Sequence, residues 1–321
     1  MTLAALSGLM PLVYAQTAKP VLAALNKAES TLAFFDPASM KLMGKVATGN
    51  DPHEVVLSTD GKTAFVSNYG AQQPGSSISV IDVATAKELH RVDLLPLLRP
   101  HGLQFIGGKL YFASETNRAI ARYDPAANKV DWLMGTGQNG SHMVAGSADQ
   151  KRFYTANIGS DSVTAFEFQN VPPAASKVIH IPVGKQPEAI DLSPDGKEVW
   201  AGLNADGAID IVDTTANKQT ARVAINGRPY RVRFTPNGKS VVCTMPATKE
   251  LLVIDAATRK ETGRMKLESV PLGLAFSADG KTAFITVVEP DAVLKIDLAK
   301  MTITGRADPG KGPDGVAVHG F

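Results

Sequence analysis

The 321-residue chain contains a single cysteine, Cys243, which excludes an intrachain disulfide and a cysteine-based zinc site. It also lacks a Cys-x-x-Cys-His motif, so covalent attachment of a c-type haem is excluded. Lysine and arginine (33) nearly balance aspartate and glutamate (31), and aromatic residues make up only 6% of the chain. Single-stranded nucleic acid is bound by basic grooves with aromatic stacking platforms, so we do not expect nucleic acid as a partner.

Apolar runs long enough to cross a bilayer as a helix are also missing from the sequence. The most apolar stretch lies within residues 1–15, and the small residues before Gln16 fit a signal-peptide cleavage site. No lysine or arginine precedes this stretch, and a buried N-terminal segment is the alternative interpretation. We expect residues 1–15 to be a signal peptide and residues 16–321 to form a periplasmic or secreted domain.

The rest of the sequence repeats a β unit that is clearest in residues 49–82. Val55 to Leu57 is a short apolar run, and Asp60-Gly61 predicts a type I′ hairpin turn, which requires positive φ. Thr63 to Ser67 and Ile78 to Ile81 are rich in β-branched residues. This order predicts a strand, a tight turn, a strand, a loop and another strand.

The residue pair that opens this unit recurs along the whole chain. The pairs are Pro52-His53, Pro100-His101, Ser141-His142, Pro187-Glu188, Pro229-Tyr230, Pro271-Leu272 and Pro313-Asp314. Their spacings of 48, 41, 46, 42, 42 and 42 residues match the period of four-stranded propeller blades. Seven units of this length predict seven blades.

The two ends of the sequence complement each other. The seventh unit has only its opening strand, Gly315 to His319, while three further strands are predicted over Val21 to Leu25, Thr31 to Asp36 and Lys41 to Val46. Pairing the C-terminal strand with the N-terminal ones would close the ring and remove a free edge. We therefore predict an all-β fold, a closed seven-bladed β-propeller with four-stranded antiparallel blades. An open β-solenoid, the alternative for such periodicity, does not explain this complementarity.

The units resemble the YVTN family of propeller repeats over essentially the whole mature chain. Residues 58–70 (STDGKTAFVSNYG) and 193–207 (SPDGKEVWAGLNADG) carry the resemblance, and the family tetrapeptide appears loosely at Phe65–Asn68 and Tyr154–Asn157. The resemblance implies YncE-like secreted or periplasmic propellers as relatives. More distant ones are the haem-carrying propeller of cytochrome nitrite reductase, the methylamine dehydrogenase heavy chain and propeller lactonases. The motif consists of turn and core residues, so it specifies a fold rather than a function.

Candidate site residues follow the repeated proline or serine, because the opening strand of a propeller blade lines the central channel. This register contains half of the six histidines; the candidates are His53, His101, His142, Glu188, Tyr230 and Asp314, with Glu54 and Arg231 one residue further along. Imidazoles and a carboxylate are ligands for a divalent ion, so His53, His101, His142 and Glu188 are a candidate metal set. The same groups could act as general acid and base, or only hydrogen-bond to the backbone where the strands begin.

These observations favour a non-catalytic protein of the cell envelope or exterior that binds a small molecule or an envelope protein, at the channel mouth or on rim loops. No nucleophile-elbow, Walker, zincin or Rossmann motif occurs in a suitable setting. Two alternatives stay open. One is a lactonase-like hydrolase or lyase that uses the channel histidines and glutamates, with or without a divalent metal. The other is an electron-transfer component with noncovalently bound haem. We expect a monomer without a transmembrane segment in the mature chain.

Overall fold

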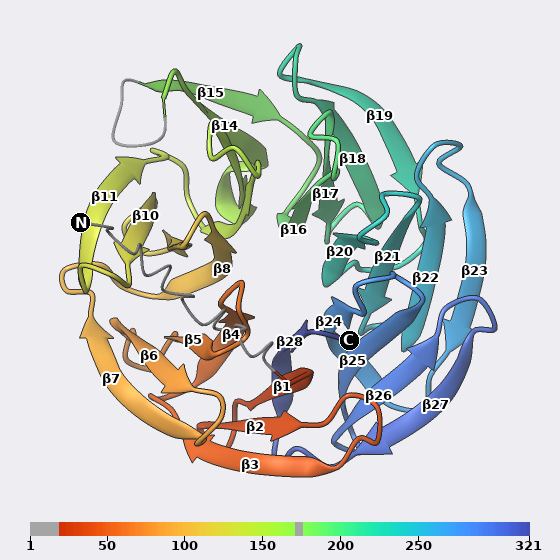
Figure 1. The fold of residues 1–321 in the computed structure, drawn as a ribbon. Helices are drawn as coiled ribbons and strands as arrows, with labels where there is room; N and C mark the ends of the chain where they lie inside the picture. The colour runs from red at the N-terminus through yellow and green to blue at the C-terminus, as the bar shows by residue number, and fades with distance from the viewer. Residues whose placement is uncertain (1–18, 171–175) are drawn as a thin grey trace, which may run out of the picture.

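The computed structural model describes residues 19–170 and 176–321, which form seven four-stranded antiparallel sheets arranged in a ring (Figure 1). The predicted all-β, seven-bladed propeller is confirmed. The predicted signal peptide lies outside the described residues. The one helical element in the described part of the chain is a short 3₁₀ turn, Ile158–Ser160. No helix there is long and apolar enough to cross a membrane.

Each sheet contains one inner strand at the channel, two middle strands and one outer strand. The inner strands are β4 (Pro52–Leu57), β8 (Pro100–Ile106), β12 (Ser141–Gly146), β16 (Pro187–Leu192), β20 (Arg231–Phe234), β24 (Val270–Phe276) and β28 (Pro313–His319). The middle strands are β1 (Val21–Asn26), β2 (Thr31–Phe35), β5 (Thr63–Asn68), β6 (Ser77–Asp82), β9 (Lys109–Ser114), β10 (Ala119–Asp124), β13 (Arg152–Asn157), β14 (Ser162–Phe168), β17 (Glu198–Leu203), β18 (Ala208–Asp213), β21 (Ser240–Met245), β22 (Glu250–Asp255), β25 (Thr282–Val288) and β26 (Ala292–Asp297). The outer strands are β3 (Leu42–Ala47), β7 (Lys87–Asp93), β11 (Lys129–Gly135), β15 (Ser176–Pro182), β19 (Lys218–Ala224), β23 (Glu261–Lys266) and β27 (Thr302–Ala307).

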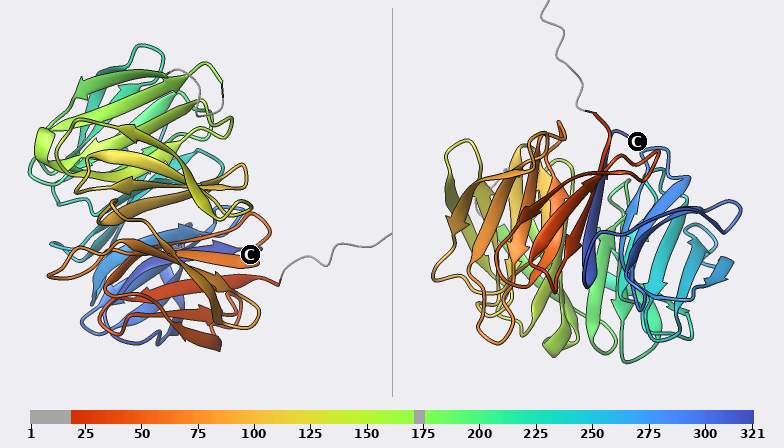
Figure 2. Two further views of the ribbon diagram at one scale, coloured as in Figure 1. Left: turned by 90° about the vertical axis from the view of Figure 1, so that its left-hand side faces the viewer. Right: turned by 90° about the horizontal axis from the view of Figure 1, so that it is seen from below.

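The ring closes as the sequence predicts, because β28 pairs antiparallel with β1 in a sheet of order β28-β1-β2-β3. Val21 lies opposite His319, and Lys27 N donates a hydrogen bond to Gly312 O at 2.8 Å. Figure 2 shows that β1 begins close to the C-terminus, at the same face of the ring. Joining segments from both ends of the chain leaves no unpaired edge between the first and last blades.

The predicted hairpin after β4 is present, but its type I′ assignment is wrong. Gly61 has φ +68°, and Asp60 is not among the residues with positive φ. Gly61 N donates to Ser58 O at 2.8 Å, and Asp60 Oδ1 accepts from Ser58 Oγ at 2.7 Å and from Lys62 N at 3.2 Å. The structure is a type I turn followed by a left-handed glycine, in which the Asp side chain stabilises the turn instead of adopting positive φ itself.

The hydrophobic core is divided among the spaces between neighbouring sheets. Trp200 of β17, for example, packs edge-on against Phe234 of β20, with ring centroids 5.5 Å apart and Met245 in the same cluster. Because the apolar side chains are buried between blades, the inner strands can present polar side chains to the channel without loss of core.

Candidate functional site

A β-bulge near the start of the inner strands determines which side chains reach the channel. The pairing register shifts between Pro52 and Glu54 in β4, and corresponding shifts occur in β8, β12, β16 and β24. A bulge places two consecutive residues opposite one and turns their side chains. His53 and Glu54 therefore both contact residues of other blades, although they are neighbours on one strand.

Three of the predicted histidines lie together at the end of the channel where the inner strands begin. His101 Nε2 is 3.3 Å from His53 Nδ1, and the His101 ring stacks on His142 with centroids 3.9 Å apart. Tyr69, which directly follows β5, adds a fourth ring, 4.4 Å from His53 and 5.3 Å from His101. We call these four residues the imidazole cluster.

Burial controls the charge of this cluster. It lowers the pKa of His53 to about 4, although the Asp314 carboxylate opposes the shift. His101 is only 1% exposed, and burial lowers its pKa well below 6.5, with His142 and His53 adding to the effect. Both imidazoles are therefore neutral at pH 7 and interact as hydrogen-bonding groups rather than as cations.

His142 is held by Glu115, a residue that the sequence did not single out. His142 Nδ1 lies 2.8 Å from Glu115 Oε2, and the Tyr69 hydroxyl donates to the same oxygen at 3.0 Å. Burial alone would raise the pKa of Glu115, but the hydrogen bonds from His142 and Tyr69 lower it. An ionised carboxylate accepts the proton of Nδ1, so in the neutral form of His142 the lone pair lies on Nε2.

An ion-paired group lies beside the imidazole cluster and is nearly closed to solvent. Arg231 Nη2 donates to Glu54 Oε1 at 2.6 Å, and Tyr230 donates through its hydroxyl to Asp314 Oδ1 at 3.1 Å. The Arg231 guanidinium also lies 4.4 Å over the Tyr230 ring and 3.9 Å from Asp314. We call Glu54, Tyr230, Arg231 and Asp314 the buried ionic group.

The charges of this group stabilise one another. Burial alone would lower the pKa of Arg231, but the Glu54 carboxylate raises it above its ordinary value, so the guanidinium stays charged. Burial raises the pKa of Glu54, and Arg231 opposes that shift. Arg231 and Asp314 are only 4% and 2% exposed, so each depends on its partner rather than on water.

Glu188, the carboxylate of the candidate metal set, does not join the histidines. Its Oε2 accepts a hydrogen bond from Asn204 and lies 3.8 Å from Arg228 Nη2. Across residues 19–170 and 176–321, no group of three or more histidine, cysteine or acidic residues is placed to hold a metal ion. The metal set of His53, His101, His142 and Glu188 stays a prediction, and the stacking of His101 on His142 directs their nitrogens along separate planes rather than toward one point.

The channel is hollow at its other end, where the inner strands finish. A cavity of about 470 Å³ there is lined by side chains that include Phe105, Arg233, Phe276 and His319. A narrow space of about 60 Å³ with Glu54 and Arg231 in its wall shares Arg233 with this cavity. We call the larger cavity the funnel, and the end with the imidazole cluster the polar end.

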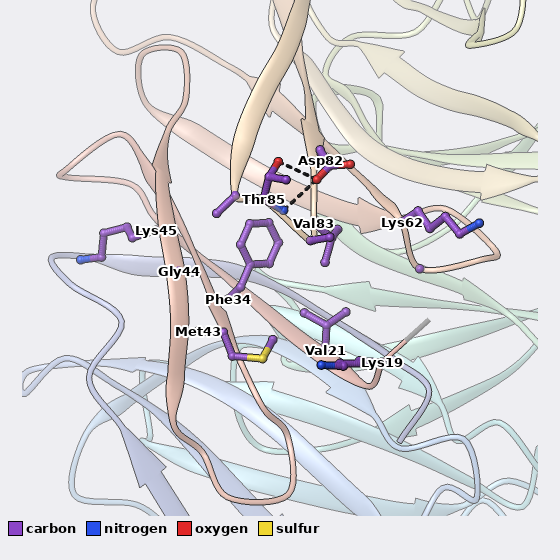
Figure 3. A pocket seen from close by; sticks show the side chains of 13 residues that line it. Lys19, Val21, Phe34, Met43, Gly44, Lys45, Lys62, Asp82, Val83 and Thr85 are labelled. Atoms are coloured by element: carbon purple, nitrogen blue, oxygen red, sulfur yellow. Dashed lines mark hydrogen bonds between the residues drawn. The ribbon is translucent and has the colours of Figure 1, made fainter. Parts of the chain in front are cut away.

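A third cavity, of about 770 Å³, lies outside the channel between β3 and the turn after β6 (Figure 3). Phe34, Met43 and Val83 contribute apolar surface to it. The Asp82 carboxylate is taken up by hydrogen bonds from the backbone and side chain of Thr85 at 2.8 and 2.6 Å. Three lysines also line this cavity, so its wall combines apolar surface with positive charge.

Comparison with known proteins agrees with this architecture. A protein of unknown function from Desulfotomaculum acetoxidans is 12% identical, with a TM-score of 0.79 over 93% of this chain and 98% of that one. Kuenenia stuttgartiensis hydrazine synthase is 20% identical, with a TM-score of 0.71 over 83% of this chain and 89% of that one. The dihydro-heme d1 dehydrogenase NirN, in complex with DHE, is 14% identical, with a TM-score of 0.66 over 97% of this chain and 77% of that one. The TM-scores show a shared fold, and at these low identities the likeness extends no further.

The sequence itself matches one family. Among curated proteins, none matches it. Residues 1–165, about half of the chain, match the model of the YNCE-like beta-propeller family. The resemblance seen in the repeats is thereby confirmed, and the chain belongs to the YncE-like β-propeller family.

Proposed function

We propose that this protein is a non-catalytic binding protein of the cell envelope or exterior, and that it takes a small ligand at the polar end of its channel. The proposal rests on the orientation of one side chain. Glu115 holds His142 through Nδ1, and Nε2 has no hydrogen-bond partner among the described residues. A hydroxyl or amine of a ligand can donate to that nitrogen.

The surroundings of His142 favour a polar but uncharged ligand. His53 and His101 are neutral near pH 7, and Arg231 is already paired with Glu54. A strongly charged ligand would lose its hydration here without gaining a free counter-ion. The partly exposed ring of Tyr69, whose hydroxyl shares Glu115 with His142, adds flat contact surface near this nitrogen. Small phenols and polyhydroxy compounds have this combination of groups.

Thermal unfolding in the presence of uncharged phenols and polyols tests the proposal. The key variant is His142→Phe, which keeps a ring to stack on His101 but removes both nitrogens. We expect at least one probe to raise the Tm of the wild type saturably and to lose this effect in the variant. His180→Phe, at an exposed position on outer strand β15, is the matched control and should behave as the wild type. Probes that stabilise neither protein, or both equally, would contradict the proposal.

The pair of Glu115 and His142 also favours a second candidate, the lactonase-like hydrolase. A carboxylate that orients an imidazole is the arrangement of a general base, which could take a proton from water attacking a ring ester. An assay of δ-valerolactone hydrolysis, in which the released acid is measured, distinguishes the two functions. Turnover that disappears in His142→Phe would favour the hydrolase, whereas ligand binding without turnover supports the binding protein.

A further inference from the structure

The funnel combines partly exposed apolar side chains with very little charge. Phe105 of β8 and Phe276 of β24 stand in its wall with aliphatic residues such as Val56 and Val318. Phe105 is fixed by stacking on Phe65, with ring centroids 5.2 Å apart. Apolar surface that stays open to water in a cavity of about 470 Å³ has the size and character of a small-molecule site.

One cationic side chain, Arg233, lies in this apolar wall, and its hydrogen-bond donors have no partner among the described residues. The Arg233 side chain is 48% exposed, and its Nε lies 4.0 Å from Asp191 Oδ2, which is beyond hydrogen-bond distance. The two oxygens of Asp191 accept instead from the backbone N–H groups of Leu192 and Phe234, at 3.0 and 2.8 Å. Within the described residues, the Arg233 guanidinium makes no hydrogen bond, so its donors are available to an incoming anion.

The side chains around Arg233 suit a ligand that carries an anionic group. Among the residues that line the funnel there is no aspartate or glutamate, so a ligand meets the guanidinium before it meets a carboxylate. Asp191 belongs to the wall of the narrower space behind. Arginine binds planar oxyanions through paired N–H donors, and aromatic rings take flat apolar bodies.

We propose that the funnel is a second ligand site, which binds a small molecule with a flat apolar body and one anionic group. The anion lies on Arg233, and the apolar body lies against Phe105 and Phe276. This site is separate from the polar end and does not depend on the function proposed for it, because it uses the opposite ends of the inner strands.

Fluorescence titration with 8-anilinonaphthalene-1-sulfonate tests this site, since the probe carries fused aromatic rings and one sulfonate. We expect one saturable site in the wild type. Arg233→Gln should weaken binding about tenfold, as expected for the loss of hydrogen bonds to a charged group, while Arg233→Lys should retain part of the affinity. Asp191→Asn should tighten binding about threefold, because it removes the carboxylate that competes for the guanidinium. Arg306→Gln, on exposed outer strand β27, is the matched control and should leave the affinity unchanged.

Two further measurements locate the bound probe. Ala317→Trp fills the funnel from β28 and should abolish binding, while its circular dichroism spectrum should match the wild type. N-phenyl-1-naphthylamine, which has the same rings without the sulfonate, should bind more weakly and be insensitive to Arg233→Gln. The proposal is overturned if Arg233→Gln binds the sulfonate like the wild type, or if His142→Phe abolishes that binding and so places it at the polar end. The latter outcome would leave the proposed function of the polar end standing.

Discussion

The two ends of the channel are built from the same seven inner strands but differ in almost every property. At the polar end, the imidazole of His101 stacks on that of His142, and Arg231 is enclosed between carboxylates. At the funnel, aromatic and aliphatic side chains surround an open space, and Arg233 remains half exposed. Arg231 and Arg233 lie two residues apart on β20. A step of two residues along one strand therefore separates a buried, hydrogen-bonded cation from a half-exposed one that makes only a 4.0 Å contact with Asp191.

This contrast shows that some positions of the repeat maintain the architecture while others determine the channel surface. Residues buried between blades, such as Val55 and Val232, keep the architecture and are apolar in every unit. Residues that face the channel carry no such constraint and can differ from blade to blade. The polar and apolar ends arise because each inner strand contributes side chains to both, from its first and its last residues.

The strongest test of the contrast replaces the two arginines with the same residue. Arg231→Met should lower the free energy of unfolding by about 3 to 5 kcal/mol, because Glu54 and Asp314 lose their buried counter-charge. Arg233→Met should change it by about 1 kcal/mol or less, since its charge is half exposed. Denaturation midpoints in urea measure both. Adding Glu54→Gln to Arg231→Met should restore part of the loss, whereas equal losses for the two arginines would contradict the comparison.

The pH dependence of stability should also come from the polar end. His53 has a pKa of about 4 when folded and near 6.5 when unfolded, so only the unfolded state takes up its proton between these values. The contribution of His53 to the free energy of unfolding is fully present above pH 6.5, and we expect it to fall by about 3 kcal/mol as the pH is lowered to 4. His101 acts in the same direction. The raised pKa of Glu54 acts in the opposite direction and reduces the total.

Denaturation midpoints between pH 7 and pH 4 measure this effect. His53→Phe, which keeps a ring against Tyr69, should flatten the pH profile, while His180→Gln on the exposed face of β15 should leave it unchanged. A His53→Phe profile that is parallel to the wild type would show that the imidazole cluster does not govern the acid sensitivity.

A smaller effect is expected from glycines near the two ends. Gly102 has φ +56°, and a Cβ there would come within 2.6 Å of the Met143 Cα, so Gly102→Ala should cost about 2 to 3 kcal/mol. Gly108, in the hairpin beyond the funnel, has φ +75° but open space around it, and Gly108→Ala should cost only about 1 kcal/mol. Thermal unfolding of both variants measures the difference. Equal costs would mean that tight packing of β8 on β12 at the polar end contributes nothing.

The fold was accessible from the sequence because it depends on local and repeated signals. The recurring pairs from Pro52-His53 to Pro313-Asp314 mark the inner strands, and the missing strands at one end are supplied from the other. The turn type at Asp60-Gly61 was wrong, because a side-chain hydrogen bond from Ser58 supports a type I turn that the dipeptide alone does not reveal.

The site was accessible only in part. The repeat placed His53, His101 and His142 on three adjacent blades, and the structure brings them together. Glu115 and Tyr69 were missed because they lie after the middle strands, outside the register that was followed, although Tyr69 directly follows a family tetrapeptide. The bulges that turn consecutive residues into the channel have no local signature, so the separate environment of Glu188 could not be predicted.

The pairing of β28 with β1 has a consequence for the order of assembly. These strands are almost 300 positions apart, so their contact carries one of the largest loop-closure costs in the chain and should form late. Until it forms, β1 presents an open edge that a β28 from a second copy fits as well as its own. Dilute refolding should therefore return monomers, while concentrated refolding should accumulate dimers that have exchanged β28.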